Sequence, residues 1–383
     1  KKKAMNKKSF CSFPFDTVFL GADGLVKTCC SARDTIGDLK TQSIEEIIHG
    51  ERAKEIRRGI ISGNWDMKNC SQCHELESVG AFTERLANAH RFEGMQDFTE
   101  DDFVLQQIDL RWSNTCNLAC NYCYEYFSSI WAKILNKHLD PLKDSTDLLT
   151  YIENNNDTVK YVNLLGGEPL LQKENHKLFD ILDKDVKGYI LTNLSVPLET
   201  NKIAQKIISD FPNITWGVSF DNVGKRFEYV RHRAEWDLLV HNLDYVGSRV
   251  KELNIHPLYN IYTAFNLVEL YEFLEDKKIN DIYWCAVLNP KHFSVFNLPL
   301  KMRQLAHKEI TRVLDRWGNK FETSRLLDIQ KDLLSERPVE NYKFLEYTER
   351  LETQLHPDKK YKFVELWPNL NKRLQKFEKS AKV

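Results

Sequence analysis

Three cysteines, Cys116, Cys120 and Cys123, lie close together in the pattern Cys-x3-Cys-x2-Cys. Cysteine thiolates ligate iron–sulfur clusters, and a 4Fe-4S cluster usually takes four of them. A set of three can ligate three irons, and it leaves the fourth iron open to another ligand. The triplet therefore predicts a 4Fe-4S cluster with an open coordination site. Chance cysteines, or half of a zinc site, are the alternative interpretation.

A second motif, Gly166-Gly167-Glu168-Pro169, follows a short apolar run of the kind that forms a buried strand. Glycines at the end of a strand let the backbone approach a ligand closely. Carbonyl groups there, together with the Glu168 carboxylate, can accept hydrogen bonds from an ammonium group. The motif alone is an ordinary turn, but after a cysteine loop and a helix-length spacer it indicates a binding site.

Together the two motifs resemble those of the radical SAM superfamily. The resemblance implies that S-adenosylmethionine binds the open iron through its amino and carboxylate groups. An electron from the cluster then cleaves the sulfonium and releases a 5′-deoxyadenosyl radical. It also implies that Tyr122 lies against the adenine and that Gly166, Gly167 and Glu168 contact the methionine amino group.

Five more cysteines precede this region: Cys11, Cys29, Cys30, Cys70 and Cys73. Residues 17–20 and 25–28, on either side of Ala22-Asp23-Gly24, have the pattern of a β-hairpin with a glycine turn. A hairpin would bring Cys11 close to Cys29. Ser43-Ile44-Glu45-Glu46 has the pattern of a capping box, which predicts a helix that returns the chain towards Cys70 and Cys73.

This arrangement resembles the SPASM or twitch domains of radical SAM enzymes, which bind an auxiliary 4Fe-4S cluster. By that resemblance Cys11, Cys29, Cys70 and Cys73 are its ligands, although four cysteines could also hold zinc. Cys30 is the spare, either a small buried side chain or a replacement for Cys29. In most such proteins the module follows the barrel, whereas here it precedes it.

The fate of the substrate radical depends on which cysteine takes part. A cluster with four cysteine ligands has no open iron, so its expected roles are electron transfer and support of the fold. Electron transfer suits an oxidation. Cys285 lies in a predicted strand, where alternation could point it into the barrel to donate a hydrogen atom, which would make the reaction redox-neutral. Inert packing is the other interpretation of Cys285.

Between residues 103 and 290, strand-like and helix-like segments alternate, which predicts right-handed crossovers and a parallel sheet. We predict strands at 104–112, 161–165, 188–192, 214–220, 256–262 and 281–288. Six such units match the partial (β/α)6 TIM barrel of the superfamily. In such barrels the chemistry collects at the C-terminal ends of the strands, which is where both motifs fall.

Polar residues at other strand ends complete the predicted site. By resemblance, Asn193 and Ser219 contact the ribose or nearby polar atoms of S-adenosylmethionine, and Arg231 contacts its carboxylate. A guanidinium suits that last role because it forms paired hydrogen bonds with a carboxylate. The alternative for Arg231 is a solvated surface charge.

The 383 residues suggest three domains: an auxiliary-cluster domain over 1–95, a radical SAM core over 103–290 and a helical C-terminal cap over 291–383. The sequence contains no apolar run long enough to span a membrane. Its net charge of −1 disfavours an electrostatic nucleic-acid binder. Nine cysteines, most of them in metal-ligand spacing, indicate a cytoplasmic protein.

We therefore predict a radical SAM oxidoreductase that abstracts hydrogen from a substrate C–H bond and oxidises a small molecule or sugar. Its reductant would be flavodoxin or ferredoxin. Two enzymatic alternatives stay open: modification of a peptide, and epimerisation with Cys285 as hydrogen donor. A different class, a non-catalytic iron–sulfur protein for electron transfer or cluster assembly, would produce no 5′-deoxyadenosine.

Overall fold

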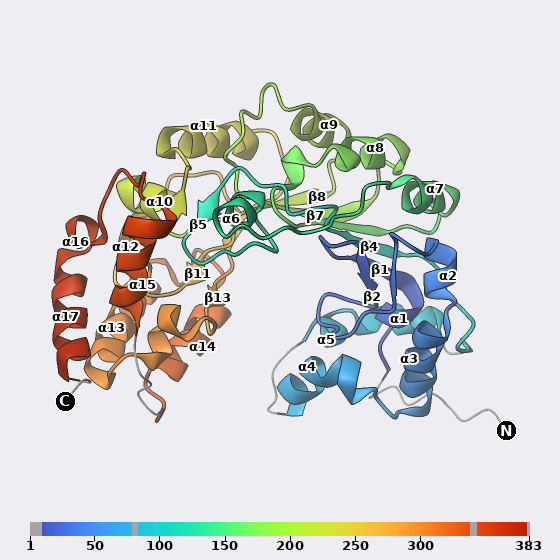
Figure 1. The fold of residues 1–383 in the computed structure, drawn as a ribbon, viewed down its shortest axis with the longest axis horizontal. Helices are drawn as coiled ribbons and strands as arrows, with labels where there is room; N and C mark the ends of the chain where they lie inside the picture. The colour runs from blue at the N-terminus through green and yellow to red at the C-terminus, as the bar shows by residue number, and fades with distance from the viewer. Residues whose placement is uncertain (1–9, 79–82, 96, 338–342, 381–383) are drawn as a thin grey trace. The chain divides into compact units, whose positions relative to one another are not determined.

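The computed structural model describes residues 10–78, 83–95, 97–337 and 343–380 (Figure 1). By their internal contacts the residues form two compact units. The first comprises the chain up to Thr115 with 138–190 and 209–214, and the second comprises 116–137, 191–208 and 215 onwards. The predicted domain limits near 95 and 290 stay a prediction.

The first unit is built on six strands that lie side by side. In sheet order they are β3 (Gly37–Asp38), β2 (Leu25–Lys27), β1 (Thr17–Leu20), β4 (Gln107–Leu110), β6 (Tyr161–Leu164) and β7 (Lys187–Thr192). Strands β1 and β2 are antiparallel, which confirms the predicted hairpin, and Gly24 takes the left-handed conformation (φ 82°) in its turn. Strand β1 also pairs in parallel with β4, so the N-terminal hairpin and the first barrel strand share one sheet.

Burial explains why these segments are strands. All residues of β1 and of β4 are buried, as expected where both faces of a parallel pair are covered. The helices of this unit are α1 (Phe13–Asp16), α2 (Ile44–Ile48), α3 (Glu51–Ser62), α4 (Met67–Ser78), α5 (Glu84–Ala87), α7 (Thr146–Asn154) and α8 (Lys173–Ile181). The capping box predicted at Ser43 is present at the start of α2, because Ser43 and Glu46 each accept the other's backbone N–H.

The second unit contains three short sets of strands. Strands β8 (Ile214–Val218), β10 (Leu253–Ile255) and β12 (Asp281–Ile282) are parallel, as are β11 (Leu258–Tyr259) and β13 (Cys285–Ala286). Strands β5 (Ala119–Cys120) and β9 (Arg231–His232) form an antiparallel pair. The helices are α6 (Ser129–Ile134), α9 (Lys202–Asp210), α10 (Gly224–Val230), α11 (Trp236–Gly247), α12 (Leu267–Leu274), α13 (Leu300–Trp317), α14 (Ser324–Leu333), α15 (Phe344–Arg350), α16 (Phe363–Leu366) and α17 (Pro368–Ser380).

Several predicted strands extend beyond the observed ones, as 104–112 extends beyond β4, and two differ further. The segment predicted at 256–262 is interrupted: β10 ends before it at Ile255, and within it only Leu258–Tyr259 (β11) form a strand. Pro257 has no N–H to give to a ladder, and the N–H of Leu258 donates to the Asp221 carboxylate instead (2.7 Å). The segment predicted at 281–288 is likewise divided into β12 and β13.

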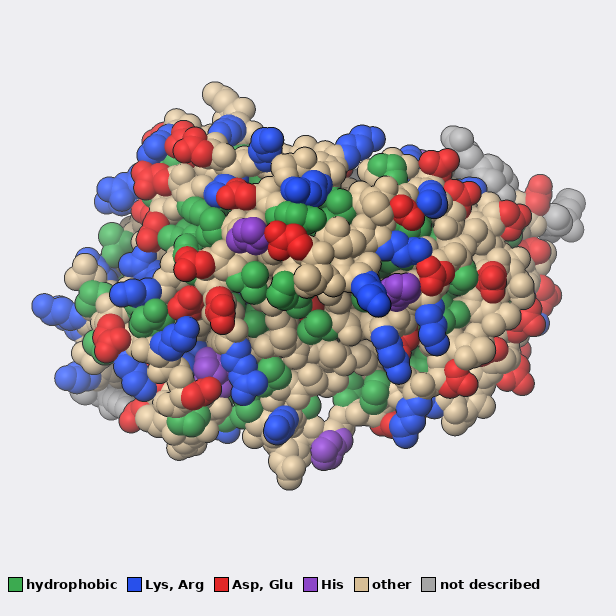
Figure 2. Space-filling model, turned by 90° about the horizontal axis from the view of Figure 1, so that it is seen from above, with side chains coloured by type: hydrophobic (Ala, Val, Ile, Leu, Met, Phe, Trp, Pro, Cys, Tyr) green, Lys and Arg blue, Asp and Glu red, His purple; other side chains and the backbone are tan. Residues whose placement is uncertain are grey.

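The predicted fold class is confirmed: an α/β protein with mostly parallel strands and a helical C-terminal region. No described helix combines the length and the apolar character needed to cross a membrane. On the face shown in Figure 2, acidic and basic side chains are interspersed, which agrees with the near-zero net charge.

Candidate functional site

The three cysteines of the triplet lie in a loop that α6 holds in place. Ser129 bonds both backbone groups of Cys116, accepting from its N–H (3.2 Å) and donating to its carbonyl (3.3 Å). The Trp131 indole donates to the Cys120 carbonyl (2.9 Å), and the Cys123 N–H donates to the same oxygen (3.0 Å). Hydrogen bonds to α6 and within the loop therefore fix the backbone conformation of the cysteine loop.

Arg231 lies opposite Cys120 in the β5–β9 pair and is 5% exposed. Its Nη1 donates to Cys120 Sγ (3.8 Å) and its Nη2 to the Asp221 carboxylate (3.3 Å), which also accepts from the Tyr122 hydroxyl. Burial acts to lower the pKa of Arg231, but the negative groups around it, Asp221 foremost, together raise it. Its Nε is buried and has no hydrogen-bond partner in the described part of the chain.

Asp221 is the central residue of this network, and sequence reasoning did not single it out. Its only signal is its place at the end of a predicted strand, two residues after Ser219. Ser219 itself is half-buried, and its N–H donates to the Thr192 carbonyl (2.9 Å).

Asn193 reaches the cysteine loop. Its side-chain amide donates to Cys116 Sγ (3.7 Å) and to Asn117 Oδ1 (2.9 Å). The structure therefore brings Asn193, Tyr122 and Arg231 to the cysteines.

In the first unit, the Gly166-Gly167 turn packs against the residue that precedes Cys116. A Cβ on Gly167 would lie 2.1 Å from the Thr115 carbonyl oxygen, so no larger residue fits. The Glu168 N–H donates to that same oxygen (2.8 Å). Gly166 has a φ of 115°, a conformation that favours glycine. The Glu168 side chain is fully buried and accepts from the Leu170 N–H (3.1 Å).

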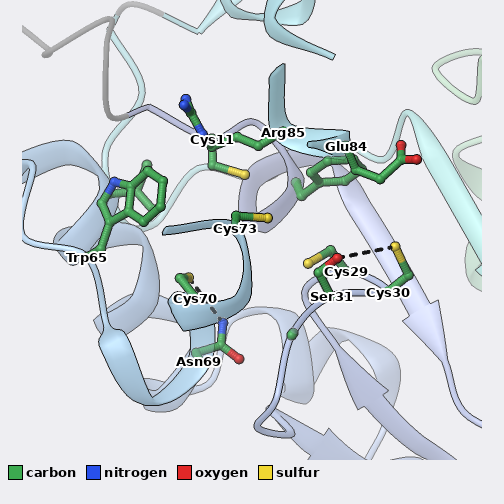
Figure 3. Close-up of a pocket in the computed structure, with 13 residues that line it drawn as sticks. Cys11, Cys29, Cys30, Ser31, Trp65, Asn69, Cys70, Cys73, Glu84 and Arg85 are labelled. Atoms are coloured by element: carbon green, nitrogen blue, oxygen red, sulfur yellow. Dashed lines mark hydrogen bonds between the residues drawn. The ribbon is translucent and has the colours of Figure 1, made fainter. Parts of the chain in front are cut away.

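Five cysteines line a pocket in the first unit (Figure 3). Cys11 precedes α1, Cys29 follows β2, and Cys70 and Cys73 lie one turn apart on α4. Figure 3 shows the sulfur of Cys29 directed towards Cys73, whereas that of Cys30 lies on the other side of the turn. Cys30 is exposed.

The cavity has the chemistry that a cluster requires. Trp65, Ile60 and Phe13 supply apolar walls, and Asn69 donates to Cys70 Sγ (3.6 Å). Burial raises the pKa of Cys70 to about 11, as it raises that of Cys123 to about 12. These thiols are protonated at neutral pH without a metal, so binding iron would release protons.

Two charged residues, Asp109 on β4 and Arg111 directly after it, were not predicted. Arg111 Nη1 donates to Asp109 Oδ1 (2.7 Å), and its guanidinium stacks 4.3 Å from the ring centre of Phe19. Burial, opposed by Arg111, raises the pKa of Asp109 to about 6. Burial raises the pKa of the Cys30 thiol, and the negative charge of Asp109 adds to that effect.

Cys285 lies on β13, and its side chain is exposed. The alternation of side chains along a strand does not reveal whether neighbouring elements cover Cys285. Its role as a hydrogen donor stays a prediction.

Two family models match the chain. Residues 11–74 match the SPASM iron–sulfur cluster-binding domain, and residues 110–274 match the radical SAM superfamily. These domains indicate 4Fe-4S clusters and S-adenosylmethionine as cofactors.

Among curated relatives, the 7-carboxy-7-deazaguanine synthase of Clostridium acetobutylicum is 30% identical over 184 residues, which are 44% of this chain and 78% of the relative. The radical SAM cyclopropyl synthase TigE of Paramaledivibacter caminithermalis is 26% identical over 51% of this chain, but the match spans only 44% of its length.

The solved structures that match part of the chain include anSMEcpe with bound AdoMet (TM-score 0.45, 18% identity, 58% of this chain and 64% of that one). Another is Streptococcus suis SuiB bound to the precursor peptide SuiA (TM-score 0.41, 17% identity, 70% of this chain and 60% of that one).

Proposed function

The chain belongs to the radical SAM superfamily, and from that premise we propose that it cleaves S-adenosylmethionine reductively and uses the resulting radical to oxidise a small molecule or sugar. Cys116, Cys120 and Cys123 would hold the cluster that supplies the electron. The observation that carries this proposal is the network around the cysteine loop, in which Arg231 and Asn193 already donate to cysteine sulfurs.

Three side chains fit different parts of S-adenosylmethionine. The buried Nε of Arg231 is a donor without a partner among the described residues, and a carboxylate would satisfy it. The Glu168 carboxylate, which follows a turn that favours glycine, would accept a hydrogen bond from the methionine ammonium group. Tyr122, fixed by Asp221, offers an aromatic surface for adenine.

Oxidation is the outcome that the auxiliary site favours. After a carbinol C–H loses a hydrogen atom, the radical must lose one electron and one proton to become a carbonyl. The cavity with Cys11, Cys29, Cys70 and Cys73 would hold the electron acceptor. Four ligating cysteines leave no iron open to substrate.

Asp109 is our candidate for the proton acceptor. It is a buried carboxylate whose pKa is raised to about 6, and Arg111 fixes its orientation. A base with a pKa near the working pH is suited to proton transfer. It belongs to the same unit as the auxiliary cavity.

The deciding experiment measures products under anaerobic conditions with dithionite or reduced flavodoxin. A radical SAM enzyme releases 5′-deoxyadenosine and methionine, slowly even without substrate, whereas an electron carrier or assembly protein releases none. Candidate small molecules, sugars and peptides would then be compared for their ability to accelerate that release. If Cys285→Ala loses turnover while variants of the auxiliary cysteines keep it, the result would favour epimerisation instead.

A further inference from the structure

The C-terminal region supplies a group of polar side chains beside Cys120. His232, which pairs with Ala119 across β5 and β9, stacks on His356 with ring centres 4.2 Å apart. His356 also contacts Trp131 (4.7 Å), the residue whose indole donates to the Cys120 carbonyl. The cysteine loop is therefore in direct structural contact with residues that follow the barrel.

Lys359 is the cation of this group, and it is only 8% exposed. Its Nζ donates to the Tyr229 carbonyl (2.6 Å) and lies 4.5 Å from the centre of the Tyr229 ring. The exposed neighbour Lys360 approaches Glu228 (4.0 Å), but no such ion pair to Lys359 occurs in the part of the chain that the structure describes. A buried ammonium held by a carbonyl and a ring, without a carboxylate in contact, is costly and needs an explanation.

The backbone connects Lys359 to the cysteine. Tyr229 lies two residues before Arg231, the partner of Cys120 in the ladder, and the Val230 carbonyl between them accepts from the next N–H after Cys120 (2.8 Å). Burial lowers the pKa of Lys359 to about 7, and the charge of Cys120 is the foremost influence that raises it. A negative charge at Cys120, such as the thiolate of a cluster ligand, would therefore favour the protonated form of Lys359.

The other titratable residues near Cys120 are paired, neutral or exposed. Arg231 is paired with Asp221 (3.3 Å). Burial lowers the pKa of His232 to about 4 and that of His356 to about 3, so both rings are neutral at pH 7. Arg233, which acts on both rings, is exposed. Among the described residues near Cys120, Lys359 is therefore a buried cation without a carboxylate in contact, in addition to Arg231, which donates to the Cys120 sulfur.

We propose that Lys359 raises the reduction potential of the cluster held by Cys116, Cys120 and Cys123. This rests on the proposed function. Reduction adds a negative charge to the cluster, and a buried cation stabilises the reduced state more than the oxidised one. The C-terminal region is then part of the redox machinery as well as a cap, and it makes the cluster easier for a cellular reductant to reduce.

The test is a potentiometric titration of the reconstituted full-length protein. The signal to follow is the EPR spectrum that changes when S-adenosylmethionine is added, which separates this cluster from the auxiliary one. In Lys359→Met we expect the ratio of reduced to oxidised cluster at a fixed potential to fall about tenfold, equivalent to about 59 mV for one electron. Lys360→Met, the exposed neighbour, should match the wild type, and Lys359→Arg should restore the potential.

An unchanged midpoint in folded Lys359→Met would overturn the proposal and leave a structural role at the Tyr229 carbonyl. An equal shift in Lys360→Met would also overturn it. If Lys359→Met does not fold, the midpoint potentials of Lys359→Gln and Lys359→Arg are compared, because these two variants differ in charge. Equal midpoint potentials would refute the effect of the positive charge. Failure of the proposed function is distinguishable, because the wild type would then show no iron signal that responds to S-adenosylmethionine.

Discussion

Substitution of Gly167 by alanine should disrupt the S-adenosylmethionine site through a clash that can be located in the structure. The added Cβ would lie 2.1 Å from the Thr115 carbonyl oxygen and 2.8 Å from the carbonyl carbon of Asn114. Real Cβ atoms essentially never approach another atom closer than 3.0 Å, so one of the two segments must move. Both are backbone, and neither can rotate away as a flexible side chain could.

The movement should affect both the folding stability and the binding of S-adenosylmethionine. Overpacking of this kind typically costs about 1–3 kcal/mol of folding stability. It also separates the Glu168 N–H from the Thr115 carbonyl (2.8 Å) and displaces the Glu168 side chain with it. We expect the affinity for S-adenosylmethionine to fall at least about tenfold, which corresponds to about 1.4 kcal/mol.

Gly224→Ala is the matched control. Gly224 has a positive φ of 56°, but its added Cβ would meet nothing within 4 Å. It should therefore cost about 1–2 kcal/mol through backbone conformation alone and leave the affinity unchanged. Thermal melting and anaerobic equilibrium binding of S-adenosylmethionine measure the two effects. Wild-type affinity in Gly167→Ala would refute our assignment of this turn to the binding site.

Three further outcomes are expected. Glu168→Gln should weaken binding of S-adenosylmethionine by about 1–3 kcal/mol, the effect of losing a charged acceptor; equilibrium binding that is unaltered would mean that the amino contact lies elsewhere. Cys70→Ala/Cys73→Ala should reduce the iron content from about eight to about four per chain and still yield 5′-deoxyadenosine but little product, whereas a normal product yield would exclude the electron-acceptor role. Asp109→Asn should likewise uncouple 5′-deoxyadenosine from product. In the wild type, product formation should decline as the pH falls below about 6, because Asp109 accepts a proton only when ionised; a flat profile between pH 5 and 7 would remove it as the base.

Features that depend on local sequence were predictable. The triplet at Cys116, the turn at Gly166, the hairpin around Gly24 and the capping box at Ser43 each involve residues a few positions apart, so their patterns carry the whole signal. The structure confirms the hairpin and the capping box where they were predicted.

Features that join distant segments were not predictable. Asp221 is important because the Tyr122 hydroxyl, the Arg231 guanidinium and the Leu258 N–H converge on it. No spacing in the sequence encodes that convergence. The same applies to Lys359, whose partner carbonyl is 130 positions earlier in the chain. Strand limits after residue 250 were misjudged because a proline and a carboxylate replace ladder hydrogen bonds there.

The parallel pairing of β1 with β4 gives a physical reason for the unusual position of the N-terminal module. The first strand of an open barrel has an unpaired edge, and such edges must be covered or paired. Here β1 occupies that edge, with Phe19 in register with Asp109. The Phe19 ring then supports Arg111, which in turn orients Asp109. If the proposed oxidation is right, a module that enters the sheet beside the first strand would bring the electron acceptor and fix Asp109 as proton acceptor through one pairing.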